Sequence, residues 1–114
     1  MLTNVGKTLP LAGGFAGKKV LVVGSLADDA DAHVGGYTNG GAHVVTVWAA
    51  VQAECSKAVG CVATHVQGGS PDSFDTSGVP AAVAAVADAD VLLVVVGDSG
   101  KTASVKQPPC TSKL

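Results

Sequence analysis

The chain has 114 residues, 47% of them hydrophobic and 14% charged, with a formal net charge of -2. This length and apolar content suit one compact domain and exclude an intrinsically disordered chain. The cations are all lysine, so no guanidinium fork is available for phosphate or guanine, and we expect no nucleic-acid partner. No apolar run reaches the roughly 20 residues that cross a bilayer, and the N-terminus lacks the basic and apolar regions of a signal peptide. We therefore expect a soluble chain with no membrane partner.

The first predicted strand follows a segment that breaks helix and strand periodicity. Residues 1–17 contain Leu9-Pro10-Leu11 and several glycines, and we interpret them as a linker. Lys19 to Val23 is apolar without alternation, which is typical of a strand covered on both faces, and Gly24 ends it. An acidic, glycine-rich loop from Ser25 to Tyr37 comes next.

A helix and a second strand are expected after this loop. Thr46 is suited to cap the helix, whose apolar side chains recur at one-turn spacings at Val47, Val51, Cys55 and Ala58. Gly60 fits the C-cap of this helix, and residues 61–66 follow as the second strand.

The remainder of the chain repeats the order of helix and strand. Residues 68–78 form a loop by composition, and Pro80 suits the first turn of a helix. One face of this helix carries Val79, Val83 and Val86. Val91 to Val96 is the clearest buried strand in the chain, and Gly97 stops it.

The resulting order β-α-β-α-β predicts an α/β fold with a small, mostly parallel sheet and flanking helices. A sheet of so few strands leaves an edge and apolar helix faces exposed, so we expect more chain or a partner domain to complete it. We therefore interpret residues 18–100 as a partial α/β sandwich domain and residues 101–114 as an unmatched, disordered tail.

The loop after the first strand is where chemistry is expected first, because ligands bind at the carboxyl ends of strands in open α/β sheets. Asp28, Asp29 and Asp31 are candidates there as general acids, cation ligands or partners of sugar hydroxyls. The alternative is that these short acidic side chains stabilise turns and helix N-termini. His33, in the same loop, is a candidate for contact with a ligand. The alternative is that His33 is an ordinary surface residue.

Metal, disulfide and nucleotide sites are weakly supported by the spacing of the residues. No Cys or His stands at metal-ligand spacing, so we expect no metal site. We expect Cys55 and Cys61 to be small buried apolar side chains, with a bridge between them as the alternative, and Cys110 completes an odd set. Gly97 to Thr102 ends in Gly-Lys-Thr like a P-loop, but it is two residues short and no helix follows. A degenerate nucleotide binder that uses Lys101 is the less favoured alternative, and we expect no cofactor.

Several short motifs stand in a fixed order between residues 9 and 99. They are Leu9-Pro10-Leu11, Lys19 to Asp29, Val34-Gly-Gly-Tyr37, Val59-Gly-Cys61, Asp75 to Val83 and Ala87 to Ser99. Taken together, this ordered set resembles the second domain of glycoside hydrolase family 3, the β-glucosidase and β-xylosidase family. Each motif is weak by itself, so the specificity of the resemblance lies in their order.

The resemblance implies carbohydrate catabolism by hydrolysis of O-glycosyl bonds, of the exo-β-glucosidase or β-xylosidase type. In that family a barrel domain supplies the nucleophilic aspartate, the α/β sandwich domain closes the active site, and members are commonly secreted or cell-wall associated. No part of this chain resembles the barrel, and retaining hydrolysis needs two carboxyl groups about 5 Å apart. The resemblance therefore implies a β-linked glycoside or oligosaccharide as partner through the missing barrel, and an isolated chain that is inactive and has no catalytic residue.

Three residues are our candidates for substrate binding or for the domain interface: Asp28, Tyr37 and Asp98. Asp28 and Asp98 follow strand ends, and the ring of Tyr37 is able to stack on a pyranose. A non-catalytic sugar-binding or scaffold module is the alternative function.

Overall fold

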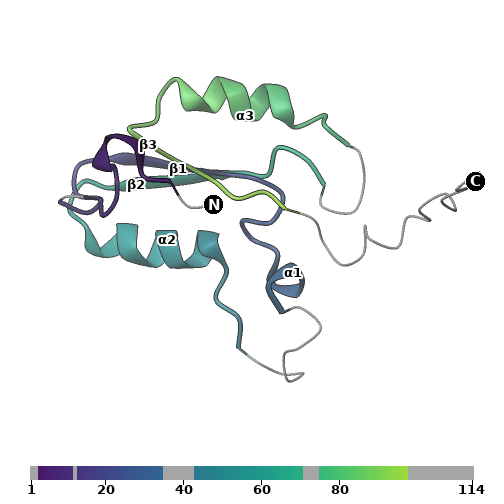
Figure 1. Cartoon of the computed structure of the whole chain (residues 1–114), viewed down its shortest axis with the longest axis horizontal. Helices are drawn as coiled ribbons and strands as arrows, with labels where there is room; N and C mark the ends of the chain where they lie inside the picture. The colour runs from purple at the N-terminus through teal and green to yellow at the C-terminus, as the bar shows by residue number, and fades with distance from the viewer. Residues whose placement is uncertain (1–2, 12, 35–42, 71–74, 98–114) are drawn as a thin grey trace, which may run out of the picture.

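The computed structural model describes residues 3–11, 13–34, 43–70 and 75–97, and helices separate its strands (Figure 1). In chain order these are a short 3-10 helix η1 (Val5–Lys7), β1 (Lys19–Val23), α1 (Ala30–Val34), α2 (Val47–Lys57), β2 (Val62–Val66), α3 (Val79–Val86) and β3 (Val91–Val94). The α/β fold with a small parallel sheet is confirmed.

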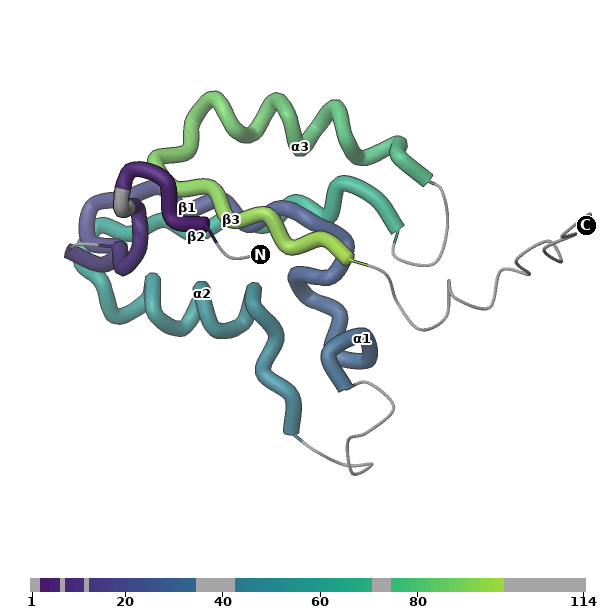
Figure 2. Tube along the Cα trace, viewed as in Figure 1, coloured from purple at the N-terminus to yellow at the C-terminus, as the bar shows by residue number. Residues whose placement is uncertain are grey.

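The sheet has the strand order β2-β1-β3, and β1 pairs in parallel with both neighbours. Val20 lies opposite Ala63 on one side and Val91 on the other. The sheet lies between two helical layers, with α2 on one face and α3 on the other (Figure 2). This placement follows from right-handed crossovers, because the chain moves from β1 to β2 in one direction and from β2 to β3 in the other.

The core is centred on β1, as its continuous apolar sequence predicts. Val20, Leu21 and Val22 are at most 1% exposed. Val20 and Val22 pack with Ala27 and with Val51 of α2, and the side chain of Leu21 points to the opposite face. Both faces of β1 are therefore covered, which confirms the prediction for Lys19–Val23.

Helix α2 begins as predicted and ends earlier than predicted. The Thr46 hydroxyl accepts a hydrogen bond from the Ala49 amide at 3.1 Å, and Val51 and Cys55 form the buried stripe. The helix ends at Lys57 with Ala58 as its C-cap, so the assignment of Gly60 to the cap is wrong. Gly60 has a φ of 72° and occupies the third position of a turn closed by the Cys61 amide and the Ala58 carbonyl. The chain needs a positive φ there to reverse towards β2.

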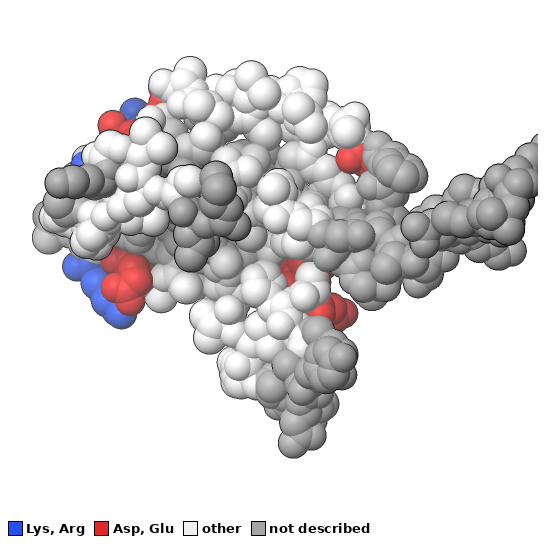
Figure 3. Space-filling model, viewed as in Figure 1, with Lys and Arg blue, Asp and Glu red and all other residues white. Residues whose placement is uncertain are grey.

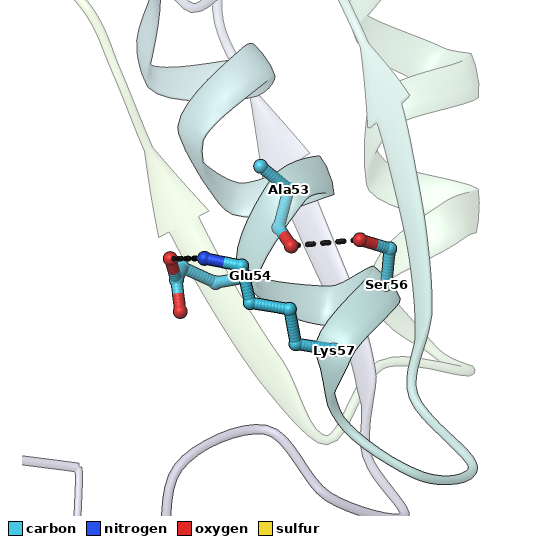
Figure 4. A network of polar contacts seen from close by, with 4 residues as sticks. All are labelled: Ala53, Glu54, Ser56 and Lys57. Atoms are coloured by element: carbon cyan, nitrogen blue, oxygen red, sulfur yellow. Dashed lines mark hydrogen bonds and ion pairs between the residues drawn. The ribbon is translucent and has the colours of Figure 1, made fainter.

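The last turns of α2 carry polar side chains that contact one another (Figure 4). The ammonium group of Lys57 lies 2.7 Å from a carboxylate oxygen of Glu54, and both side chains are more than 60% exposed. The Ser56 hydroxyl donates to the Ala53 carbonyl at 2.8 Å. An exposed pair of this kind contributes at most about 1 kcal/mol, so α2 is held chiefly by its buried face.

Cys55 and Cys61 form a disulfide, which corrects the expectation of two separate buried thiols. Cys55 is 5% exposed on the inner face of α2, and the tight turn after the helix returns Cys61 to face it, with 5.3 Å between the two Cα atoms. The bridge joins the end of α2 to the start of β2.

Strand β3 departs from the prediction in position and in burial. It covers Val91–Val94 at the edge of the sheet, instead of a fully buried strand to Val96. Val91, Leu93 and Val95 pack against the core, whereas Leu92, Val94 and Val96 on the other face are 42%, 59% and 71% exposed. The reason is that α3 lies over β1 and β2 and leaves the outer face of β3 uncovered.

Candidate functional site

The strand order places the carboxyl ends of β1 and β3 side by side, and the crevice is defined here as the space outside these two ends. The chain reaches β2 from β1 over one face of the sheet and returns from β2 to β3 over the other face. Open α/β sheets bind ligands outside the carboxyl ends of their strands. The residues described there are Gly24 to Asp29 after β1 and Val95 to Gly97 after β3.

Main-chain contacts hold the ends of the three strands together at this crevice. The amide of Gly24 donates to the carbonyl of Val66 at 3.1 Å. The amide of Val95 donates to the carbonyl of Val23 at 2.8 Å. Gly24 has a φ of 135°, and a Cβ built on it would fall on the carbonyl of Val95. The base of the crevice is therefore rigid main chain.

Asp28 is exposed and lies in the loop after β1, where the sequence placed it. Its Oδ1 accepts a hydrogen bond of 2.8 Å from the hydroxyl of Thr46, which is 7% exposed and caps α2. The carbonyl of Ala27 also accepts a bond from the Trp48 amide at 2.9 Å. Asp28 thus fastens the loop to the N-terminus of α2. The other two candidates, Tyr37 and Asp98, lie outside the described residues.

The acidic loop contains a short helix that the sequence did not predict. Within the stretch Ser25 to Tyr37, Asp29 accepts a bond from the Ala32 amide at 2.9 Å and so caps α1. The carbonyl of Asp29 lies 2.6 Å from Nδ1 of His33. For Asp29, the alternative that acidic residues stabilise helix N-termini is confirmed, because its carboxylate binds the helix.

A groove of about 350 Å³ lies beside the crevice, between α3 and the sheet. Aliphatic side chains of α3 and β3 form most of it, and polar groups from the loops stand at one end: Ser25, Gln67, Asp75 and Thr76. No sequence pattern indicated this polar end, because these residues come from two loops, one after β1 and one between β2 and α3. The described lining residues include no aromatic ring to stack on a sugar, so the groove is suited to apolar contacts.

Asp75 is the residue near this groove with a displaced pKa. The amide of Ser77 donates to its Oδ1 at 2.9 Å, and this bond, with a second from the Ser77 hydroxyl, lowers the pKa of the Asp75 carboxyl. The direction indicates a carboxylate that stays ionised, so Asp75 is suited to accept hydrogen bonds and not to donate a proton.

One buried polar atom stands apart from the crevice. His65 of β2 stacks on Trp48 of α2 with 5.5 Å between ring centroids. Its Nε2 is buried and has no hydrogen-bond partner among the described residues. The sequence predicted no role for His65, and its position in the layer between sheet and helix makes it a packing residue.

The described residues provide no metal centre and no membrane-spanning helix. No group of three His, Cys, Asp or Glu side chains comes together in the described part of the chain. No helix in that part is long and apolar enough to cross a bilayer. Lys101 of the P-loop-like segment lies outside it.

In a comparison with known protein families, one family model matches nearly the whole chain. The model of the glycosyl hydrolase family 3 C-terminal domain matches residues 1–107. No curated protein and no solved structure matches the chain. The family match agrees with the parallel α/β arrangement and with the ordered motifs between residues 9 and 99. The chain therefore belongs to glycoside hydrolase family 3, whose C-terminal domain it carries.

Proposed function

We propose that the chain is the α/β lobe of a glycoside hydrolase of the exo-β-glucosidase or β-xylosidase type, and that it takes part in carbohydrate catabolism. Its partner is a β-linked glycoside or oligosaccharide held between this lobe and a barrel domain. The observation that carries the proposal is the match of residues 1–107 to the C-terminal domain of family 3. The crevice at the ends of β1 and β3 supports it, since that is the ligand-binding edge of such a sheet.

We further propose that the isolated chain does not hydrolyse glycosides. Retaining hydrolysis needs a nucleophile and an acid/base carboxyl about 5 Å apart. The carboxylates described at the crevice, Asp28 and Asp29, each accept a hydrogen bond that holds the fold. Groups fixed in this way are suited to bind and orient a substrate, and the nucleophile has to come from the barrel.

Asp28, Tyr37 and Asp98 are the residues that we propose to face the barrel and the sugar. The exposure of Asp28 after β1, and its anchoring by Thr46, support this role for Asp28. A carboxylate whose position is fixed loses little side-chain entropy when it accepts a sugar hydroxyl.

Turnover and binding test the two parts of the proposal separately. The purified chain is assayed with 4-nitrophenyl β-glucoside and β-xyloside, and we expect no hydrolysis above buffer. Activity that follows the chain through successive columns would contradict the inactivity. Methyl β-glucoside is then titrated into the labelled chain, and we expect amide shifts that centre on residues 25–29 and shrink in Asp28→Asn. The matched control is Glu54→Gln on the outer face of α2, and shifts that Asp28→Asn leaves unchanged would rule out Asp28 as a sugar contact.

A further inference from the structure

The first turn of α2 holds the loop after β1 at two neighbouring residues. The Thr46 hydroxyl donates to Oδ1 of Asp28 at 2.8 Å. Two residues further on, the amide of Trp48 donates to the carbonyl of Ala27 at 2.9 Å. Thr46 and Ala27 are both buried, so each attachment has one end in the core of the domain. The loop is therefore fixed to α2 at Asp28 and at the residue before it.

The side chain of Trp48 fixes this first turn to the sheet. Its ring stacks on that of His65 in β2, with 5.5 Å between the centroids and 26° between the planes. Stacked aromatic pairs of this kind add to the stability that burial provides. His65 lies opposite Val22 of the central strand, whose side chain is fully buried. The contacts therefore run without a break from β2, through the first turn of α2, to the loop after β1.

Asp28 is held by a helix that lies outside its own loop. The next carboxylate, Asp29, accepts its hydrogen bond from the Ala32 amide of α1, which directly follows it in the chain. In the view of Figure 3 acidic side chains gather over α1 and the loop before it, and no lysine lies beside them. A carboxylate has two oxygens with about four lone-pair sites, so Asp28 can accept a sugar hydroxyl while it keeps its bond to Thr46.

We infer that Thr46, Trp48 and His65 are positioning residues of the crevice, which set its affinity for a β-glycoside by fixing the Asp28 carboxylate. This inference rests on the proposed function, in which Asp28 contacts the sugar. Thr46 acts directly through its hydroxyl, and Trp48 and His65 act by holding the first turn of α2 in place. A carboxylate that is already fixed loses less side-chain freedom when it binds, so its release weakens the complex.

Titration of methyl β-glucoside into the labelled full chain, followed by NMR, tests the positioning role. Thr46→Val removes the hydroxyl and should weaken binding about fivefold, whereas Thr46→Ser keeps it and should restore the affinity. His65→Ala removes the stack on Trp48 and should weaken binding about threefold, and His65→Phe, which keeps a ring, should restore it. If His65→Ala does not keep the native circular dichroism, His65→Leu takes its place. The matched control is Leu21→Val, which loosens the core on the opposite face of β1 and should leave the affinity unchanged.

An Asp28→Ala background separates positioning from a general loss of stability. If Thr46 and His65 act through Asp28, their substitutions should cause no further loss of affinity in this background. Unchanged affinity in Thr46→Val or in His65→Ala, or equal losses with and without Asp28, would overturn the inference and leave the proposed function standing. A wild-type chain whose residues 25–29 shift with neither methyl β-glucoside nor methyl β-xyloside would instead refute the proposed function, and the inference with it.

Discussion

The carbonyl of Val95 occupies the space in which a side chain at Gly24 would begin. These two residues follow the adjacent strands β3 and β1, and the amide of Val95 donates to the carbonyl next to Gly24, that of Val23, at 2.8 Å. The close approach of main chain to main chain determines how near the two loops of the crevice come to each other. Glycine is the residue that fits at position 24, because the φ of 135° and the lack of space both exclude a Cβ.

Gly24→Ala should therefore destabilise the fold strongly. The strained backbone and the overlap with Val95 together predict a loss of at least about 3 kcal/mol in the free energy of unfolding. Urea denaturation followed by circular dichroism measures it. The control is Gly13→Ala, where φ is 81° and no atom lies within 4 Å, so strain alone should cost about 1 to 2 kcal/mol. Equal losses in the two variants would show that the contact with Val95 is unimportant.

Thr46 connects the cap of α2 to the candidate site, and its hydroxyl is predicted to stabilise both. Thr46→Ala removes the bonds to the Ala49 amide and to Asp28, and should lower the free energy of unfolding by about 1 to 2 kcal/mol. Thr46→Ser keeps the hydroxyl and should retain most of it. Asp28→Ala combined with Thr46→Ala should cost less than the sum of the two, by about 1 kcal/mol, because the shared bond is lost once. Additive losses would argue against that bond.

Asp75 is predicted to make stability depend on pH in the acid range. Its pKa is lowered in the folded chain, so the folded state favours the carboxylate. The resulting stability is fully present above the unfolded pKa, near pH 4, and is lost as the pH falls through the lower folded pKa. Asp75→Asn should remove this part of the acid dependence.

NMR titration of the Asp75 carboxyl carbon checks the cause of its pKa. Ser77→Ala removes the hydroxyl but keeps the amide, which is the larger cause, so the pKa should rise in this variant and still remain below its ordinary value. A full return to the ordinary value would assign the shift to the hydroxyl instead.

The disulfide predicts the thiol count of the native chain. Of its three cysteines, the native chain should expose one to alkylation, and all three should react after reduction, as mass spectrometry can show. Replacing both Cys55 and Cys61 by alanine should lower the free energy of unfolding by about 2 kcal/mol, because the short loop is no longer closed in the unfolded chain. Cys110→Ala is the control and should leave stability unchanged. Three reactive thiols in the native chain would contradict the bridge.

Sequence patterns predicted those helices and strands well whose bounds depend on interactions between residues close together in the chain. The continuous apolar run of β1 and the Thr46 cap of α2 are correct to the residue, because burial on two faces and capping leave direct marks on the sequence. The end of α2 was predicted less well, since the turn through Gly60 depends on where β2 lies.

Features that depend on contacts between residues far apart in the chain were not predicted from the sequence. The apolar run of β3 predicts a strand that is covered on both faces. In the structure one face packs against the core, and the other face is open because α3 lies over β1 and β2. Asp28 was expected in an acidic loop, but its bond to Thr46 spans eighteen residues and no spacing rule reveals it. The polar end of the groove is likewise assembled from two loops that lie far apart in the sequence.

The central position of β1 has a consequence for how the molecule opens. It is paired along both edges, and three of its side chains are buried, so β1 is fully exposed to water only when the whole domain unfolds. Strands β2 and β3 are each paired along one edge, but the bridge between Cys55 and Cys61 ties the start of β2 to α2, so β3 is the strand that can detach while the rest stays folded. Breathing of the domain therefore starts at β3, beside the crevice.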